Sequence, residues 1–83
     1  MAGLVRFALK APKEEICYMS WTIDAYEGVA FLQNEGEDGV VSIFCPPEYS
    51  AETERIIASF ESEGITIERY GSFQTGDRGN ELV

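Results

Sequence analysis

Two cysteines are the residues best suited to chemistry in this 83-residue sequence. Cys17 and Cys45 lie far apart in the chain and lack the Cys-x-x-Cys spacing of redox and zinc sites. We expect them at the same end of the domain, near two helix N-termini, where they could form a redox or soft-metal pair. Carboxylates at Glu14, Glu15 and Glu48 oppose thiolate formation, so the alternative is two inert, mostly buried thiols.

The sequence contains no histidine, which removes the usual general base and the commonest metal ligand. No serine has a Gly-x-Ser-x-Gly or Ser-x-x-Lys context, so nucleophilic catalysis has no visible base. Residues 34–39, Asn-Glu-Gly-Glu-Asp-Gly, superficially resemble a calcium loop, but Cys45 occupies the position where a bidentate glutamate is required. We therefore expect a protein that is not an enzyme and uses no cofactor or metal.

The charge balance narrows the possible partners. Six Lys and Arg residues against 15 Asp and Glu residues give a net charge of -9, which repels phosphate backbones and anionic lipid headgroups. We expect neither nucleic acid nor a membrane surface as a partner. No signal-like leader or membrane-length apolar run is present, and the two cysteines suit a reducing compartment, so we expect a cytoplasmic protein.

The secondary-structure elements that must position these residues can be predicted from the spacing of apolar residues and from the prolines and glycines that end strands and helices. Apolar alternation indicates strands, Pro12 suits the first turn of a helix, and Gly28 and Gly64 suit helix ends. The cluster at 34–39 is typical of a hairpin turn. We expect strands over residues 4–10, 29–33, 40–45 and 65–70, and helices over residues 12–27 and 49–63.

The order strand, helix, two strands, helix, strand predicts a ferredoxin-like α+β plait. Right-handed crossovers then give a four-stranded antiparallel sheet of order 4-1-3-2 with both helices on one face. We expect one domain over residues 1–73 and a flexible, polar tail over residues 74–83.

The first helix is apolar on two sides. Ile16, Met19 and Ile23 share one stripe, whereas Tyr18 and Trp21 lie on the reverse side. The sheet, the second helix or the tail could cover these aromatic residues, or one of them could stay half exposed as scattered surface apolar residues often do. The alternative is a contact patch for a partner, since Trp and Tyr are favoured interface anchors.

The sheet face without helices is the second candidate surface. If Val5, Phe7 and Phe31 face the helices, apolar residues also occupy the open face, among polar ones such as Arg6 and Ser42. A contiguous apolar patch on a small domain usually marks an interface, and two-fold dimers are the commonest solution. We expect a homodimer or a protein partner; the alternative is a monomer with a half-polar sheet face. The candidate contact residues are Leu4, Ala8, Leu32, Val40, Phe44 and Tyr70 on the sheet, with Tyr18 and Trp21 as a second contact.

Residues 15–30 carry a pattern of acidic, Ile, any, Tyr, apolar, any and aromatic residues, followed by Tyr-acidic-Gly-apolar-Ala. This pattern, with the strand leading into Pro46 and Pro47, resembles a small bacterial family catalogued as domain of unknown function 4911, over residues 5–63. The resemblance implies a cytoplasmic bacterial protein and no transferable catalytic residue. The chain after Tyr70 has no counterpart in that pattern.

The expected fold also resembles ACT-type regulatory domains, which bind amino acids at dimer interfaces. This resemblance implies a small-molecule regulatory domain with a pocket near residues 10–13 as the alternative function. Those domains usually carry an acidic-x-x-Gly turn between the first strand and first helix. Here the segment is Lys10-Ala11-Pro12-Lys13, and this departure counts against such a ligand site.

Overall fold

The computed structural model describes residues 3–26, 28–36 and 38–75, with side chains described as far as residue 73. No helix in these ranges is both long enough and apolar enough to span a membrane. The elements in chain order are β1 (Leu4–Lys10), α1 (Lys13–Asp24), β2 (Phe31–Asn34), β3 (Val40–Cys45), a 3-10 turn (Pro47–Tyr49), α2 (Ser50–Ser62) and β4 (Glu68–Thr75).

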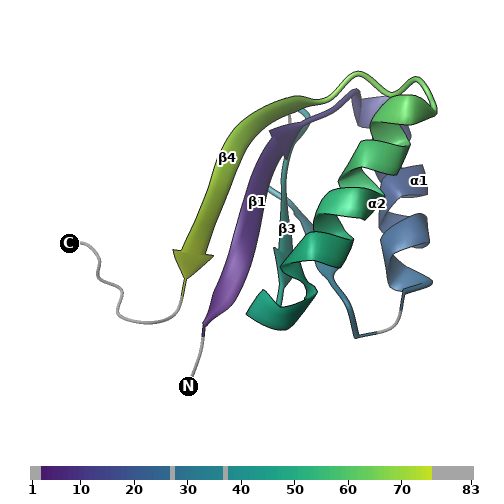
Figure 1. Cartoon of the computed structure of the whole chain (residues 1–83). Coiled ribbons are helices and arrows are strands. Elements are labelled where there is room, and N and C mark those ends of the chain that lie inside the picture. Colours follow the sequence, from purple (N-terminus) through teal and green to yellow (C-terminus); the bar gives the residue numbers. More distant parts are fainter. Residues whose placement is uncertain (1–2, 27, 37, 76–83) are drawn as a thin grey trace.

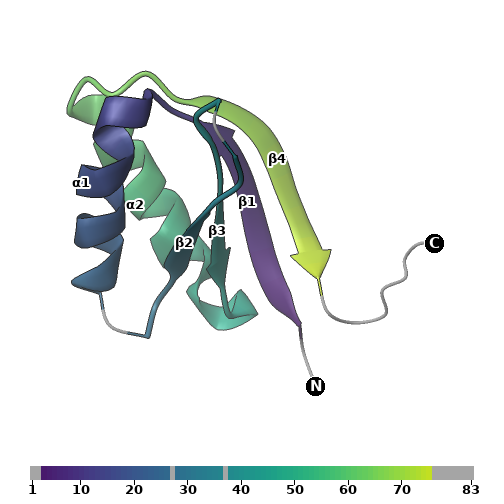
Figure 2. The same cartoon turned by 180° about the vertical axis from the view of Figure 1, so that it is seen from behind.

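The four strands form one antiparallel sheet in the order β2-β3-β1-β4. Read from the other edge this is 4-1-3-2, so the predicted βαββαβ plait is confirmed. Figure 1 shows α1 and α2 side by side on one face of the sheet, and Figure 2 shows the same arrangement from behind, with β2 as one edge strand. The opposite face of the sheet carries no helix among the described residues.

Both helices begin where proline stops the preceding strand. Pro12 has extended backbone angles and lies directly before α1, whose first turn carries Glu14 and Glu15 at the positive end of the helix dipole. α1 ends at Asp24, earlier than the predicted residue 27, because the Tyr26 N–H donates to the Ile23 carbonyl in a closing turn. The 3-10 turn over Pro47–Tyr49 leads into α2.

The core lies between the helices and the sheet. Alternate residues of β1 and β3 point into it, and they meet the apolar stripes of α1 and α2. Each large apolar side chain that is fully buried contributes about 1.5–3 kcal/mol. The largest fully buried apolar side chains are Phe60, Leu9, Met19, Ile23, Ile43, Ile57 and Val41.

The register of β2 differs from the prediction. The strand begins at Phe31 and pairs Phe31 with Phe44 and Leu32 with Ile43, so Phe31 is on the open face and Leu32 packs against the core. Placing Leu32 on the open face was therefore wrong. The physical reason is the period of two, since a shift of one residue exchanges the faces of an entire strand. Ala30 also packs against the core, just before the strand.

β4 begins later than predicted and is longer. Ile65 and Ile67 pack against the core, but the strand itself starts at Glu68 and continues to Thr75. The register shifts between Ala8, which pairs with Gly71, and Leu9, which pairs with Arg69, leaving Tyr70 as the extra residue of a bulge. The predicted tail overlaps the last two residues of this strand, and residues 76–83 lie outside the described chain.

Gly39 joins the hairpin to the start of α1. Its carbonyl accepts a hydrogen bond of 2.9 Å from the Ala11 N–H, its φ is +82°, and a Cβ at this position would collide with the Ala11 carbonyl oxygen. We expect Gly39→Ala to lower the free energy of unfolding by about 2–4 kcal/mol, combining the left-handed backbone cost with the clash.

Urea denaturation measures this loss, and Gly28→Ala is the matched control. Gly28 has a similar φ of +80°, but a Cβ added there would meet no heavy atom of the described residues within 4 Å. The control should cost only the backbone term of about 1–2 kcal/mol. Equal losses for the two variants would show that the contact with Ala11 has no energetic weight.

Candidate functional site

The open face of the sheet is organised in three rows of residues that pair across the strands. We call them the aromatic row, the small row and the charged row, and each runs perpendicular to the strands. From β2 to β4 the aromatic row is Phe31, Phe44, Arg6 and Phe73, the small row is Gln33, Ser42, Ala8 and Gly71, and the charged row is Val40, Lys10 and Glu68.

The aromatic row contains one ring contact at each end. The Phe31 and Phe44 rings are 5.2 Å apart between centroids with an interplanar angle of 21°, which is a stacked arrangement. The guanidinium carbon of Arg6 lies 5.4 Å from the centroid of the Phe73 ring, within cation–π range. Phe31 and Phe73 remain 48% and 47% exposed. Two aromatic rings thus stay accessible although other side chains already hold them in place.

Arg6 leans from the aromatic row over the small row. Its Nε donates a hydrogen bond of 2.9 Å to Ser42 Oγ, and the Phe73 ring lies close to Gly71. Ser42 and Ala8 are consequently 0% and 5% exposed although no described helix covers this face. Ala8, a predicted contact residue, therefore lies on the open face but is buried beneath its neighbours.

Apart from Leu32, which packs against the core, the other predicted sheet residues lie on this face. Leu4, Val40 and Phe44 are partly buried in it, and Tyr70 is exposed at the bulge with its hydroxyl donating to Glu68 Oε1 at 3.3 Å. Sequence reasoning missed Phe31 and Phe73. Phe31 was assigned to the wrong face, and Phe73 lies beyond the predicted end of the fourth strand.

The open face is poor in carboxylates. Its three rows contain one, Glu68, together with the cations Arg6 and Lys10. The remaining carboxylates of the described residues lie on the helices and in the loops, in a chain whose net charge is -9. The three rows are therefore less acidic than the rest of this strongly acidic molecule.

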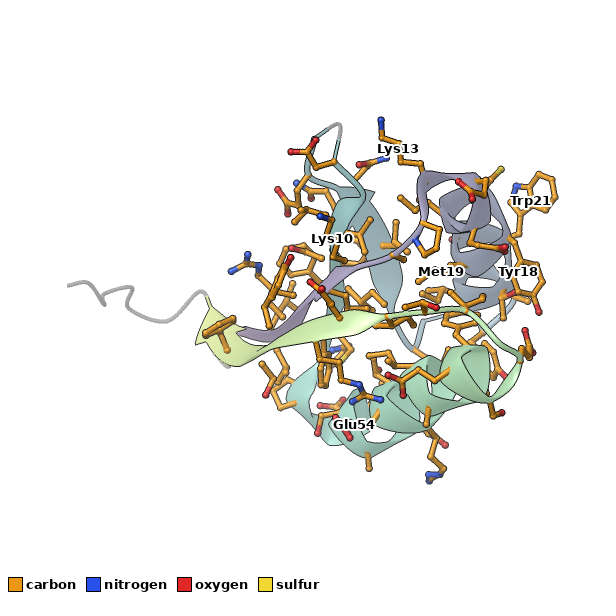
Figure 3. The ribbon with its side chains drawn as sticks, turned by 90° about the horizontal axis from the view of Figure 1, so that it is seen from above. Lys10, Lys13, Tyr18, Met19, Trp21 and Glu54 are labelled. Carbon is orange, nitrogen blue, oxygen red and sulfur yellow. The ribbon has the colours of Figure 1, made fainter. Side chains whose placement is uncertain are left out.

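The aromatic residues of α1 form a separate feature. Figure 3 shows Tyr18 and Trp21 on the outer side of α1, whereas Met19 points inward. Tyr18 is held by its own chain: its hydroxyl donates to Glu63 Oε1 at 2.7 Å, which raises its pKa, and its ring meets Phe60 edge to face. Trp21 is 69% exposed, and its side chain makes no hydrogen bond or ring contact with any residue described. The helix layer separates both from the open face.

The two thiols are not positioned as a pair. β1 and β3 are antiparallel, with Cys45 opposite Val5, so Cys45 lies where β1 begins, whereas α1 starts beyond the other end of β1. The expectation that both thiols share one end was therefore wrong, because it required these strands to run in the same direction. Cys17 is exposed, Cys45 is completely buried, and burial raises the pKa of Cys45. Within the described residues, no group of three or more acidic or thiol side chains could hold a metal ion.

A depression lies where the alternative prediction placed a ligand pocket. It has a volume of about 280 Å³ and is bounded by the segment that links β1 to α1, by Asp38 of the hairpin and by the approach to β4. Both signs of charge occur in its wall. The lining residues are Lys10, Ala11, Pro12, Lys13, Asp38, Thr66 and Glu68.

The helix side of β4 carries an ion-pair cluster with a structural role. Arg69 contacts Glu54 at 3.1 Å and Glu61 at 2.9 Å, and so joins β4 to α2. The hydrogen bond from Arg69 lowers the pKa of Glu61. These groups satisfy one another on the face opposite the three rows.

Comparison with protein-family models, with curated proteins and with solved structures gives no match, so the resemblance of residues 15–30 to the bacterial family named above gains no support. The fold itself, a ferredoxin-like plait, is established by the strand order and the connections.

Proposed function

We propose that this chain is a non-enzymatic cytoplasmic self-association module that dimerises through the open face of its sheet. The observation that supports the proposal is the aromatic row, in which Phe31 and Phe73 stay half exposed while stacking and a cation–π contact hold the row in place. Preformed aromatic anchors lose little conformational freedom on binding and are enriched at interfaces.

The charge distribution favours the open face over the other surfaces of the molecule as the place where a second copy docks. A chain with a net charge of -9 repels its copies, but the open face carries only Glu68 among its three rows. Packing two open faces together therefore keeps the acidic helices and loops on the outside, as far apart as the fold permits. The product would be a four-layer dimer with helices outside and two sheets inside.

The size of the face suits a reversible dimer. Four strands of four to eight residues, about 4.8 Å apart, give a plan area of about 400 Å² per copy, which side-chain relief enlarges. Stable interfaces bury about 800 Å² per partner, and transient ones bury less. We therefore expect dimerisation that depends on concentration.

Sedimentation equilibrium of the natural sequence tests the proposal. The monomer mass is 9.2 kDa, and the dimer has twice this mass. We expect the average mass to rise toward the dimer value between about 1 µM and 1 mM, the range of Kd typical of reversible association. A mass that stays at the monomer value throughout would remove the proposal.

A second candidate function is small-molecule binding at the depression between Lys10 and Lys13. The supporting observation is its wall, in which Lys10 and Lys13 could bind a carboxylate and Asp38 and Glu68 an amine. An amino acid at 100 times its Kd should stabilise the fold by about 2.7 kcal/mol, which raises Tm by about 10 °C or more. A thermal-shift screen of amino acids checks this, with Lys13→Gln and Asp38→Asn as variants that should abolish the shift. A flat screen eliminates the candidate.

A further inference from the structure

We infer that the second copy docks with one defined geometry, in which the guanidinium of Arg6 binds the carboxylate of Glu68 in the other copy, and reciprocally. This inference rests on the proposed dimer and adds the pairing that fixes its register. It places the two-fold axis over the small row, parallel to the sheets and perpendicular to the strands. A two-fold interface then contains each pairing twice.

The row spacing brings these two groups together. The aromatic and charged rows lie on opposite sides of the small row, each two residues away, which is about 6.6 Å along the strands. A two-fold axis over the small row therefore sets each aromatic row opposite the charged row of the other copy. With packed sheets about 10 Å apart and adjacent strands about 4.8 Å apart, the Cα atoms of Arg6 and the second Glu68 are about 11 Å apart. Arginine and glutamate side chains span this separation.

Both groups retain bonding capacity for such a pair. Arg6 uses Nε on Ser42, and within the described residues its terminal guanidinium N–H groups make no hydrogen bond. Glu68 accepts one bond from the Tyr70 hydroxyl, and in the described part of the chain its other carboxylate oxygen is unbonded. An arginine that is oriented by a neutral hydroxyl and a ring, with its outer edge unpaired, is arranged to bind a carboxylate.

In the same arrangement, Lys10 affects the affinity of the dimer. Lys10 neighbours Glu68 in the charged row and comes opposite Arg6 of the other copy. Two cations then share one carboxylate on each side of the axis. Lys10→Gln is therefore expected to tighten the dimer about two- to five-fold, since like charges across an interface oppose association.

Charge reversal and mixing test the inference. Arg6→Glu and Glu68→Arg are each expected to weaken self-association at least about 30-fold, because each creates two like-charged pairs per dimer. An equimolar mixture of the two variants has opposite charges at both pairing sites. It should dimerise within about tenfold of the natural sequence, and native mass spectrometry should show the heterodimer in excess over both homodimers.

Matched controls separate the possible outcomes. Glu52→Arg and Arg55→Glu make the same charge changes on exposed α2 positions away from the open face and should leave the natural Kd within about threefold. Circular dichroism confirms that each variant folds, and recovery in the mixture confirms that both chains remain competent. If the natural sequence dimerises but the mixture does not recover, the pairing of Arg6 with Glu68 is overturned while the dimer proposal stands. If the natural sequence is monomeric, the proposed function itself has failed.

Discussion

The double variant Phe31→Asp/Phe73→Asp should remain monomeric at concentrations where the natural chain dimerises. Each dimer would bury four new carboxylates in place of four rings that are about half exposed in the single chain. Burying an unpaired charge is costly, and loss of one aromatic anchor alone can cost about 2 kcal/mol or more. We expect the Kd to rise at least about 1,000-fold, as measured by sedimentation equilibrium.

The matched control places two aspartates on the helix side of the molecule. Trp21 and Tyr26 are exposed to a similar or greater extent than the two phenylalanines, and neither belongs to the rows of the open face. Trp21→Asp/Tyr26→Asp adds the same charge, so it tests whether position or net charge matters. A dimer weakened equally by both double variants would contradict association through the open face.

Raising the salt concentration is expected to tighten the dimer. Two bodies of charge -9 with centres about 25 Å apart repel by about 5 kcal/mol at 0.01 M ionic strength and by less than about 1 kcal/mol at 0.15 M, because the Debye length falls from about 30 Å to about 8 Å. The Kd should therefore fall about 1,000-fold or more over this range, since each 1.4 kcal/mol corresponds to about tenfold in Kd. Analytical ultracentrifugation at several salt concentrations measures the slope.

The sign of this slope distinguishes a second copy from another occupant. A basic protein docking on an acidic chain would dissociate as salt rises, since screening removes its attraction. Apolar contact between two acidic copies behaves in the opposite way. Dissociation of a natural-sequence dimer by moderate salt would show that charge attraction rather than the aromatic row holds the copies together.

The fold was predictable because the residues that end its strands and helices act locally. Pro12, Pro47 and the hairpin glycines act within a few residues, and the order of the elements restricts the sheet to one arrangement once crossovers are right-handed. The apolar stripe of the first helix likewise includes Met19 and Ile23, and both are fully buried.

The candidate site was less predictable, since it depends on register. The face occupied by Phe31 and Leu32 is set by the pairing of β2 with β3, and the hydrogen bond from the Glu35 N–H to the Val40 carbonyl fixes that pairing at the turn. An apolar pair of adjacent residues does not reveal which of them faces inward. Phe73 was missed for a related reason, because the bulge at Tyr70 and the glycine at 71 interrupt the alternation that indicates a strand.

Cys17 is exposed and Cys45 is fully buried, so only the Cys17 thiol is accessible to a labelling reagent. A maleimide reagent should react at the helix, which leaves the sheet untouched. In a dimer with its sheets at the centre, two spin labels attached there would be separated by three layer spacings, about 30 Å. Pulsed dipolar spectroscopy covers that range, so the distance between labels on the two copies of Cys17 would report how the copies are arranged.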